Sequence, residues 1–544
     1  MNSYGAKMSK LLTLIFCTGA LGLMCIPALG QLIDRTHTPN IANEGIAKSY
    51  TEQIGAGRGS VTTPDSSLFI INRDPFRAIR RGRQLFQRKF TRSQGQGPLE
   101  GDGQIGDINT NLALGAGLAD SCAGCHGRPR GSAGFGGDVV TRPDSRDAPH
   151  LFGLGLKEML ADEITSDLRA IRAAAISEAR SRRTTITRSL NSKGINFGSI
   201  RAFSNGSVDT SGVRGVDADL RVRPFFAHGG TISIREFAVG AFDAEMGLQP
   251  VDPDTFIAQA GNRVVTPSGM VLDGRIDNIE VAFNGDNTAG DEDNDGVANE
   301  VPTSIVDFME FYLLHYFKPA TRNNGDDEIA PGRSLFVQIG CANCHIPNLT
   351  INRDRRVADV ETTFAREDLV RSDGGRGNPF VRLFAVATAS FTEVNDGTGF
   401  PSIKRPRFGS FVVRNIFTDF KRHDLGPNFH ELNYDGTLQR QFLTTPLWGV
   451  GSTAPYGHDG RSPTLQDVIR RHGGAAQSAR DRFTNLTLVD QEKIIAFLNF
   501  LVLFPPDDTP SNLNPTNPGA PGYPQFGHGS INLTALFNNP GDIE

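Results

Sequence analysis

The sequence predicts a mainly α-helical protein made of two related domains that are joined by long loops rich in Gly and Pro. A Cys-x-x-Cys-His motif occurs at residues 122–126 and again at residues 341–345, and a similar lead-in precedes each copy, Gly82-Arg-Gln-Leu-Phe86 and Gly332-Arg-Ser-Leu-Phe336. A repeat of this kind indicates a duplicated unit. The 61 Gly and 31 Pro residues predict long irregular connections. Very little of the chain shows the alternation typical of β-strands.

Composition and charge exclude several classes of protein. Hydrophobic residues make up 38% of the chain and charged residues 21%, which excludes bulk disorder and a polytopic membrane protein. The 55 Lys and Arg residues against 60 Asp and Glu residues give a net charge of −5. We therefore expect no basic surface for nucleic acid.

Residues 1–30 are predicted to be a signal for export. Lys7 and Lys10 precede an apolar stretch at residues 11–26, and the small residues Ala28 and Gly30 stand before a cleavage site ahead of Gln31. An uncleaved membrane anchor is the alternative, although the apolar stretch is short for a span. After cleavage no membrane span is expected.

The cysteines of the mature chain all lie in the two repeated motifs, as Cys122, Cys125, Cys341 and Cys344. Covalent attachment of haem c explains this pattern, because each thiol adds to a haem vinyl group and the following histidine, His126 or His345, binds the iron. Zinc is the alternative, since it also binds paired cysteines, but it would give the two histidines no use. The sequence thus predicts two covalently bound haems c.

The two motifs also divide the chain. We expect the signal at residues 1–30, an N-terminal cytochrome c-like domain at residues 31–270, a C-terminal cytochrome c-like domain at residues 271–505 and a tail rich in Pro, Asn and Gly at residues 506–544. Further helices are expected at residues 161–183, 303–317 and 489–503, the last of them ended by Pro505 and Pro506.

His472 is a candidate sixth ligand of a haem iron. A helix is expected to begin with Ser462 as its cap and Pro463 in its first turn, and to end at Gly473. Helical spacing puts His472 on one apolar stripe with Leu465, Val468 and Ile469. An imidazole at the end of a buried stripe needs a partner, and an iron would supply one. The alternative is a histidine that caps the helix C-terminus.

Glu245 is a second candidate, for proton transfer. Helical spacing from Ile234 puts it back on the face that holds Phe237, Ala238, Ala241 and Phe242, shortly before Gly247 ends the helix. A carboxyl on a face that points to the core is desolvated, which favours its neutral form and suits it to moving protons. The alternative is a glutamate at a frayed helix end that turns to water.

An acidic loop provides candidate calcium ligands. Asp291, Asp293 and Asp295 alternate before Gly296, as the oxygen ligands of calcium loops do. Pro302 stands where an EF-hand has its bidentate Glu, so Glu300 or Asn299 would have to complete the site. A solvated acidic loop is the alternative.

Taken together, these motifs resemble the bacterial di-haem cytochrome c peroxidases, and most of all their branch of di-haem oxidoreductases, often labelled thiol oxidoreductase-like. The resemblance extends in order from about residue 82 to residue 506. Besides the two haem motifs, it rests on residues 146–156 (RDAPHLFGLGL), 244–247 (AEMG), 418–426 (TDFKRHDLG), 445–449 (TPLWG), 453–460 (TAPYGHDG) and 472–474 (HGG).

The resemblance implies a role for each site. The haem at His126 is the catalytic one, with Glu245 in the place of the distal acid–base, and the haem at His345 receives electrons from a small cytochrome c or a cupredoxin. His472 stands where the peroxidases usually have Met, so a His/His iron is expected, with a lower potential than a His/Met iron. Thr453 and Pro455 match residues whose backbone oxygens hold an interdomain calcium. Export by the signal at residues 1–30 would place the protein in the periplasm.

The chain departs from the family pattern at three points. No His lies between residues 127 and 149 to block the first iron, so this iron is expected to be open, with His150 as the one nearby candidate to close it. The family often has a Trp between the haems, whereas the sole Trp here, Trp448, belongs to the second half. A bis-His second haem also occurs in rubber oxygenases.

The function expected from the sequence is that of a periplasmic enzyme, a di-haem cytochrome c peroxidase-like oxidoreductase, which reduces hydrogen peroxide. One alternative is an oxygenase that activates O2 on an apolar substrate at the same iron. The other is a di-haem electron carrier without catalytic activity, which requires both irons to be six-coordinate.

Overall fold

The computed structural model describes residues 49–73, 75–97, 119–126, 147–279, 290–291, 295–315, 320–321, 326–355, 359–362, 387–390, 393–394, 402–403, 410–433, 437–451 and 453–502. The expected signal at residues 1–30 and the expected tail at residues 506–544 lie outside these residues.

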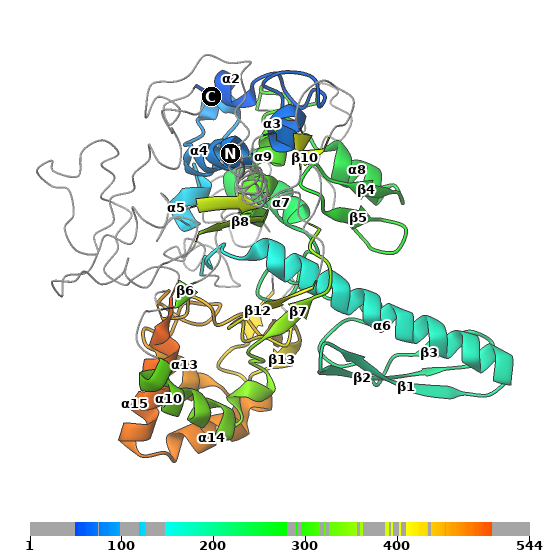
Figure 1. The fold of residues 1–544 in the computed structure, drawn as a ribbon, viewed down its shortest axis with the longest axis vertical. Helices are drawn as coiled ribbons and strands as arrows, with labels where there is room; N and C mark the ends of the chain where they lie inside the picture. The colour runs from blue at the N-terminus through cyan, green and yellow to red at the C-terminus, as the bar shows by residue number, and fades with distance from the viewer. Residues whose placement is uncertain are drawn as a thin grey trace, which may run out of the picture.

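Helices dominate the described residues, which confirms the mainly α fold class (Figure 1). The α-helices are α2 (Tyr50–Ile54), α3 (Ser67–Arg73), α4 (Pro75–Gln87), α5 (Cys122–His126), α6 (Leu154–Arg182), α7 (Ile234–Met246), α8 (Pro253–Gln259), α9 (Thr303–His315), α10 (Asp326–Gln338), α13 (Leu465–Arg471), α14 (Gln477–Thr484) and α15 (Leu488–Phe500). Short 3-10 helices are η2 (Arg92–Gln94), η3 (Cys341–Asn343) and η4 (Gly474–Ala476). Two expected helices differ in extent, since α6 begins seven residues earlier and α15 ends before a short strand.

Strands are more frequent than the sequence indicates. A three-stranded antiparallel sheet has the order β1 (Ile186–Ser192), β2 (Ile195–Ala202), β3 (Val208–Asp209). The other strands form antiparallel pairs: β4 (Arg263–Val265) with β5 (Val271–Asp273), β6 (Ala320–Thr321) with β17 (Leu501–Val502), β7 (Leu349–Ile351) with β12 (Phe411–Val413), β8 (Asp359–Thr362) with β9 (Ala387–Ser390), β10 (Glu393–Val394) with β11 (Ser402–Ile403), β13 (Arg422–Asp424) with β16 (Gln441–Leu443), and β14 (Glu431–Leu432) with β15 (Leu438–Gln439). Pairs this short are too brief to give a periodic pattern.

The repeated lead-in forms the same helix crossing twice. Gly82 lies in α4 and Gly332 in α10, each at its point of closest approach to a second helix. A Cβ on Gly82 would overlap the Phe308 carbonyl of α9, and one on Gly332 would overlap the Lys493 carbonyl of α15. Both positions therefore need glycine so that two helix backbones can meet.

Two main apolar clusters surround these crossings. The first contains α3, α4, α6, α7 and α9 together with β1 and β2, and the second contains α10, α13 and α15 (Figure 1). The C-terminal half of α6 extends away from α4 and α9, with β1–β3 beside it. The expected division after residue 270 stays a prediction; α9, which that division assigns to the second half, packs against α4.

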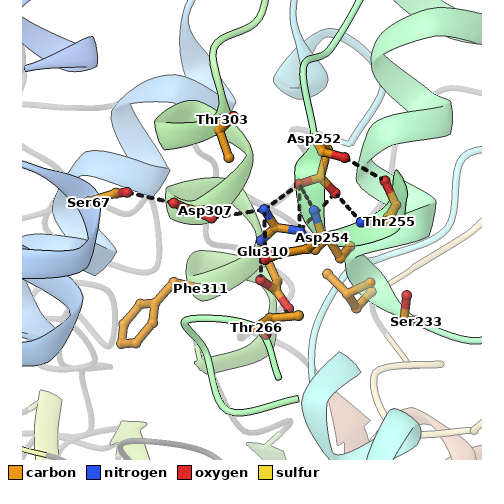
Figure 2. A network of polar contacts seen from close by, with 12 residues as sticks. Ser67, Ser233, Asp252, Asp254, Thr255, Thr266, Thr303, Asp307, Glu310 and Phe311 are labelled. Atoms are coloured by element: carbon orange, nitrogen blue, oxygen red, sulfur yellow. Dashed lines mark hydrogen bonds and ion pairs between the residues drawn. The ribbon is translucent and has the colours of Figure 1, made fainter. Parts of the chain in front are cut away.

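A buried ionic network holds α7, α8 and α9 together (Figure 2). Arg235 of α7 is 0% exposed and its guanidinium lies 2.6 Å from Asp252, 2.9 Å from Asp307 and 2.8 Å from Glu310. Asp252 also caps α8, Asp307 accepts the Ser67 hydroxyl of α3 at 2.6 Å, and Glu310 accepts the Thr266 hydroxyl. This one cation therefore connects four elements of the first cluster.

We predict that Arg235→Met destabilises the protein by about 3–5 kcal/mol, because it leaves buried carboxylates without their cation. Urea denaturation followed by circular dichroism measures the loss of unfolding free energy. The matched control is Arg275→Met, which removes an exposed arginine paired with Asp273 and should change stability little. If both substitutions lowered the free energy of unfolding equally, the buried network would not stabilise the fold more than an exposed ion pair does.

The buried ionic network also predicts that the free energy of unfolding depends on pH. Burial raises the pKa of Glu310 from an ordinary 4.5 to about 7, although Arg235 opposes the rise. Between these two pH values the folded state binds more protons than the unfolded state, so stability should fall as pH rises from about 4.5 to about 7. Urea titrations across this range should show a shallower fall in Glu310→Gln than in the parent protein, and an unchanged slope would contradict the assignment.

Candidate functional site

The first motif occupies a single helical turn, α5. The hydroxyl of Ser121 accepts the Gly124 N–H at 3.2 Å, which starts the turn. The half-buried ring of His126 places Nδ1 2.7 Å from the Pro149 carbonyl oxygen. Because a carbonyl accepts, Nδ1 carries the proton, and Nε2 therefore has the lone pair that can bind a metal.

The histidine of the second motif is oriented in the same way, by a backbone carbonyl from another part of the chain. Cys341 begins η3, and the Nδ1 of His345 lies 3.1 Å from the Phe417 carbonyl oxygen. The carbonyl that accepts from His126 lies 23 positions after it in the chain, and the carbonyl that accepts from His345 lies 72 positions after it. Both hydrogen bonds set the tautomer that haem ligation requires.

The structure brings His472 and His345 together. His472 follows α13 as its C-cap, and its Nδ1 donates to the Val468 carbonyl at 2.6 Å. Burial, and next the proximity of His472, lower the pKa of His345 to about 4. The ring of His472 thus bonds a carbonyl of the last turn of α13, which is compatible with the alternative role at the helix end, and the role as an iron ligand stays a prediction.

The start of α13 differs from the expectation. Thr464, and not Ser462, is the N-cap, and its side chain accepts the Asp467 N–H at 3.2 Å. Ser462 is buried one turn earlier, where its backbone pairs with Tyr456 and its hydroxyl accepts from Arg471 at 2.8 Å. The reason is that Ser462 belongs to the closed turn at residues 456–462, which leaves the cap position to the next hydroxyl.

The turn at residues 456–462 positions α13. Arg471 lies 2.6 Å from Asp459 in this turn and 4.4 Å above the ring of Phe429. Phe429 in turn meets the His472 ring edge-to-face at 5.3 Å. These contacts fix the helix end that carries His472.

The remaining histidines of the second cluster have structural partners. His458 lies 3.0 Å from Glu431 and stacks on Phe442 at 4.0 Å. His423 lies 2.8 Å from Asp419; burial lowers its pKa, but hydrogen bonds to Asp419 and Cys344 outweigh burial and raise it to about 9.

The two cysteine pairs of the described residues lie in different apolar clusters. Burial raises the pKa of Cys122 and of Cys341 to about 12. Within the described part of the chain, the grouped side chains of metal-ligand type are Cys344, Asp419 and His423. A zinc site that joins the two cysteine pairs therefore has no support in this geometry.

Glu245 lies in the last turn of α7, which Gly247 ends in the left-handed conformation at φ 62°. Its carbonyl accepts the Ala119 N–H at 3.1 Å, three residues before Cys122. The side chain is half-buried, as are Phe237 and Ala241 on the same face, whereas Ala238, Phe242 and Met246 are buried. Glu245 therefore stands beside the first motif, at the edge of the core-facing stripe.

His150 lies next to His126 but has both ring nitrogens engaged. Its Nδ1 accepts the Phe152 N–H at 3.3 Å, so its hydrogen bond to the Trp448 backbone uses Nε2. Burial, followed by Lys157, lowers the pKa of His150 to about 3. This arrangement leaves no nitrogen of His150 to bind a metal.

The candidate calcium ligands are only partly described, since Asp293 lies outside the described residues. The Asp291 carboxylate accepts the N–H groups of Asp295 and Gly296, both at 3.0 Å. The carboxylate of Glu300 accepts the Gln249 N–H at 2.7 Å through Oε2, and its part in a calcium site stays a prediction. Thr453 donates its hydroxyl to the Gly449 carbonyl, and Pro455 follows a cis peptide bond.

Sequence reasoning missed the groups that orient the histidines. The carbonyls of Pro149, Phe417 and Val468 carry no side-chain signal, so a linear pattern could not reveal them.

One family model matches part of the second half of the chain. Residues 380–501 match the family model described as "Di-haem oxidoreductase, putative peroxidase". This match confirms that the chain resembles the di-haem oxidoreductases, whose cofactors are haems. No curated protein matches.

One similar solved structure is titled "Crystal structure of a MauG-like protein associated with microbial copper homeostasis". It is 14% identical, and the alignment covers 64% of this chain and 88% of that chain with a TM-score of 0.21. A likeness of this size carries no argument. None of the described helices is long and apolar enough to cross a membrane.

If a haem iron binds at His345, as the sequence predicts, we expect His472→Ala to convert it from low spin to high spin, because the substitution removes the candidate sixth ligand. Electron paramagnetic resonance of the ferric protein measures the change. The matched control is His430→Ala, whose ring pairs with Asp424 instead and should leave the spectrum unaltered. A low-spin signal that survives in His472→Ala would refute the ligand assignment.

Proposed function

We propose that this chain is a di-haem c oxidoreductase that reduces hydrogen peroxide. The observation that carries the proposal is the asymmetry of the two motif sites. His472 lies close enough to His345 to lower its pKa, whereas His150, close to His126, has hydrogen bonds to the backbone of Phe152 and of Trp448. This arrangement suits an enzyme that accepts electrons at a six-coordinate iron at His345 and reacts with peroxide at an open iron at His126.

The donor sets fit the cofactor. Cys122 and Cys125 would hold one haem and Cys341 and Cys344 the other, each beside a histidine whose Nδ1 is already bound to a carbonyl. When bound, the first haem supplies an iron with an open position at which the O–O bond of peroxide is reduced.

Glu245 is the residue to which we assign proton transfer. Its backbone is tied to the segment that leads into Cys122, and its carboxyl is half-buried on a face shared with Phe237 and Ala241. In this role it would take a proton from one oxygen of peroxide and return it to the departing oxygen, which leaves as water when the O–O bond breaks. The other oxygen would leave as a second water after two electrons from the donor and two further protons arrive.

The proposal includes the remaining expectations from the sequence. Electrons enter through the site of His345 and His472 from a small cytochrome c or a cupredoxin. The protein is exported to the periplasm by residues 1–30. Calcium binds between the halves at the backbone oxygens of Thr453 and Pro455, or in the loop of Asp291, Asp293 and Asp295.

One observation favours a second candidate, an oxygenase acting on an apolar substrate. Phe226 is 41% exposed and packs on Phe237 at 5.0 Å, and Phe225 lies 6.3 Å from the same ring. Phe237 shares its face of α7 with Glu245, so an aromatic surface adjoins the proton-transfer residue. Such a surface would suit an apolar substrate of O2 chemistry.

The test of the proposed function is electron paramagnetic resonance of the resting ferric protein, matured with haem in a bacterial periplasm, followed by peroxide and O2 assays. One high-spin and one low-spin signal, together with peroxide turnover, are expected. Two low-spin signals would favour an electron carrier, and O2 consumption with an apolar substrate but no peroxide turnover would favour the oxygenase.

We predict that Glu245→Gln lowers peroxide turnover by about 10²–10⁴-fold, because the amide cannot accept and return a proton. Steady-state peroxide consumption measures this, with haem content checked by the pyridine haemochrome spectrum. The control is Asp243→Asn, a half-buried acid in the same turn of α7, which should leave turnover near the parent value. Unchanged turnover in Glu245→Gln would show that another group moves the proton.

A further inference from the structure

The turn at residues 456–462 touches the segment that orients the histidine of the first motif. The N–H of Asp147 donates to the His458 carbonyl of this turn at 2.7 Å. Two residues further along, Pro149 accepts the hydrogen bond of His126 at 2.7 Å. The turn therefore helps to place the short stretch of backbone on which the direction of the His126 ring depends.

The same turn holds the residue next to His472. Asp459 is 4% exposed, and its two oxygens accept from the Arg471 guanidinium at 3.1 Å and 2.6 Å. That guanidinium also donates to the Asn428 carbonyl at 2.9 Å. Burial raises the pKa of Asp459, but the hydrogen bonds from Arg471 and from the Arg461 backbone outweigh burial and lower it below its ordinary value. Asp459 thus stays charged, and a bidentate pair fixes the direction of the guanidinium as well as its position.

Arg471 has two routes to the ring of His472. The first is the chain itself, because Arg471 directly precedes His472, and Gly473 on its other side donates to the Leu425 carbonyl at 2.8 Å. The second is Phe429, whose ring lies 4.4 Å from the Arg471 guanidinium and meets the His472 ring edge-to-face at 5.3 Å. A shift of Arg471 therefore changes how the His472 ring is held.

Two glycines show how closely the turn fits on each side. A Cβ on Gly457 would lie 2.7 Å from the Asp459 carboxylate and 3.1 Å from the Arg471 guanidinium, whereas a Cβ on Gly460 would lie 3.2 Å from Cβ and Cγ of Asp147. Burial, and next the proximity of Asp459, raise the pKa of Asp147 to about 7, so these two carboxyl groups are neighbours. The turn is therefore packed tightly between the two segments.

We propose that Asp459 is a positioning residue for both iron sites. Through Arg471 it holds His472, and through the turn that Asp147 bonds it sets the segment that orients His126. A displacement at either site then reaches the other through one buried carboxylate. This inference rests on the two haems of the proposed function, but it does not depend on peroxide being the substrate.

The experiment uses the full chain loaded with both haems, and Asp459→Asn removes the charge at nearly the same volume. Electron paramagnetic resonance of the ferric protein should show the loss of part of the low-spin signal of the second haem, because His472 is held less firmly. Resonance Raman spectra of the ferrous protein should show a shifted iron–histidine stretching band of the first haem, because this band reports the hydrogen bond of His126.

Two further variants each act on one side of the turn. Arg471→Lys keeps the charge but loses the planar fork, and it should alter only the signal of the second haem. Gly460→Ala places a methyl group against Asp147, and it should shift only the band of the first haem. The matched control is Asp467→Asn, an acid of α13 that accepts the Thr464 hydroxyl at 2.6 Å. This control lowers thermal stability at most and should leave both spectra at the parent values.

Parent spectra of both haems in Asp459→Asn, with full haem content, would overturn the proposal, and so would a change confined to one haem. If Asp459→Asn does not fold, parent spectra in both Arg471→Lys and Gly460→Ala overturn it instead. A parent protein without a low-spin haem at His345 would refute the proposed function together with this inference, whereas the outcomes above leave the proposed function intact.

Discussion

The buried guanidinium of Arg235 is the constraint on which the first cluster depends. Taking a cation out of water is unfavourable unless several carboxylates surround it, and here Asp252, Asp307 and Glu310 do so. These partners come from different elements, so the network can close only when α7, α8 and α9 are all in place. Since Glu245 lies at the other end of α7, the position of the proton-transfer candidate follows from the same closure.

The repeated helix crossing provides the second framework. Gly82 and Gly332 permit the same close approach, of α4 to α9 and of α10 to α15. Each crossing stands before its own Cys-x-x-Cys-His motif, so the same local scaffold presents both sites. The scaffold does not by itself make the sites different. The difference comes from later segments, which bring His472 to one site and a fully hydrogen-bonded His150 to the other.

Much of the fold follows from local rules, and the departures have local reasons. An Ala-rich stretch indicates α6, a helical stripe indicates α7 and apolar runs indicate α9 and α15, and Gly247 ends α7 as the sequence predicts. Short strand pairs could not be predicted, because two or three residues carry no period. Thr464 replaces Ser462 as the cap of α13 because Ser462 is held in a closed turn.

The sequence by itself identified the candidate cofactor-binding residues. These are the two Cys-x-x-Cys-His motifs with their repeated lead-ins, and a histidine at the end of an apolar stripe. Such information is local, so a linear pattern can contain it. Only the tertiary structure decided which carbonyls orient the histidines, that His150 is occupied, and that Trp448 lies against Gly153. Each of these contacts joins segments far apart in the chain or uses backbone atoms, and packing alone selects them.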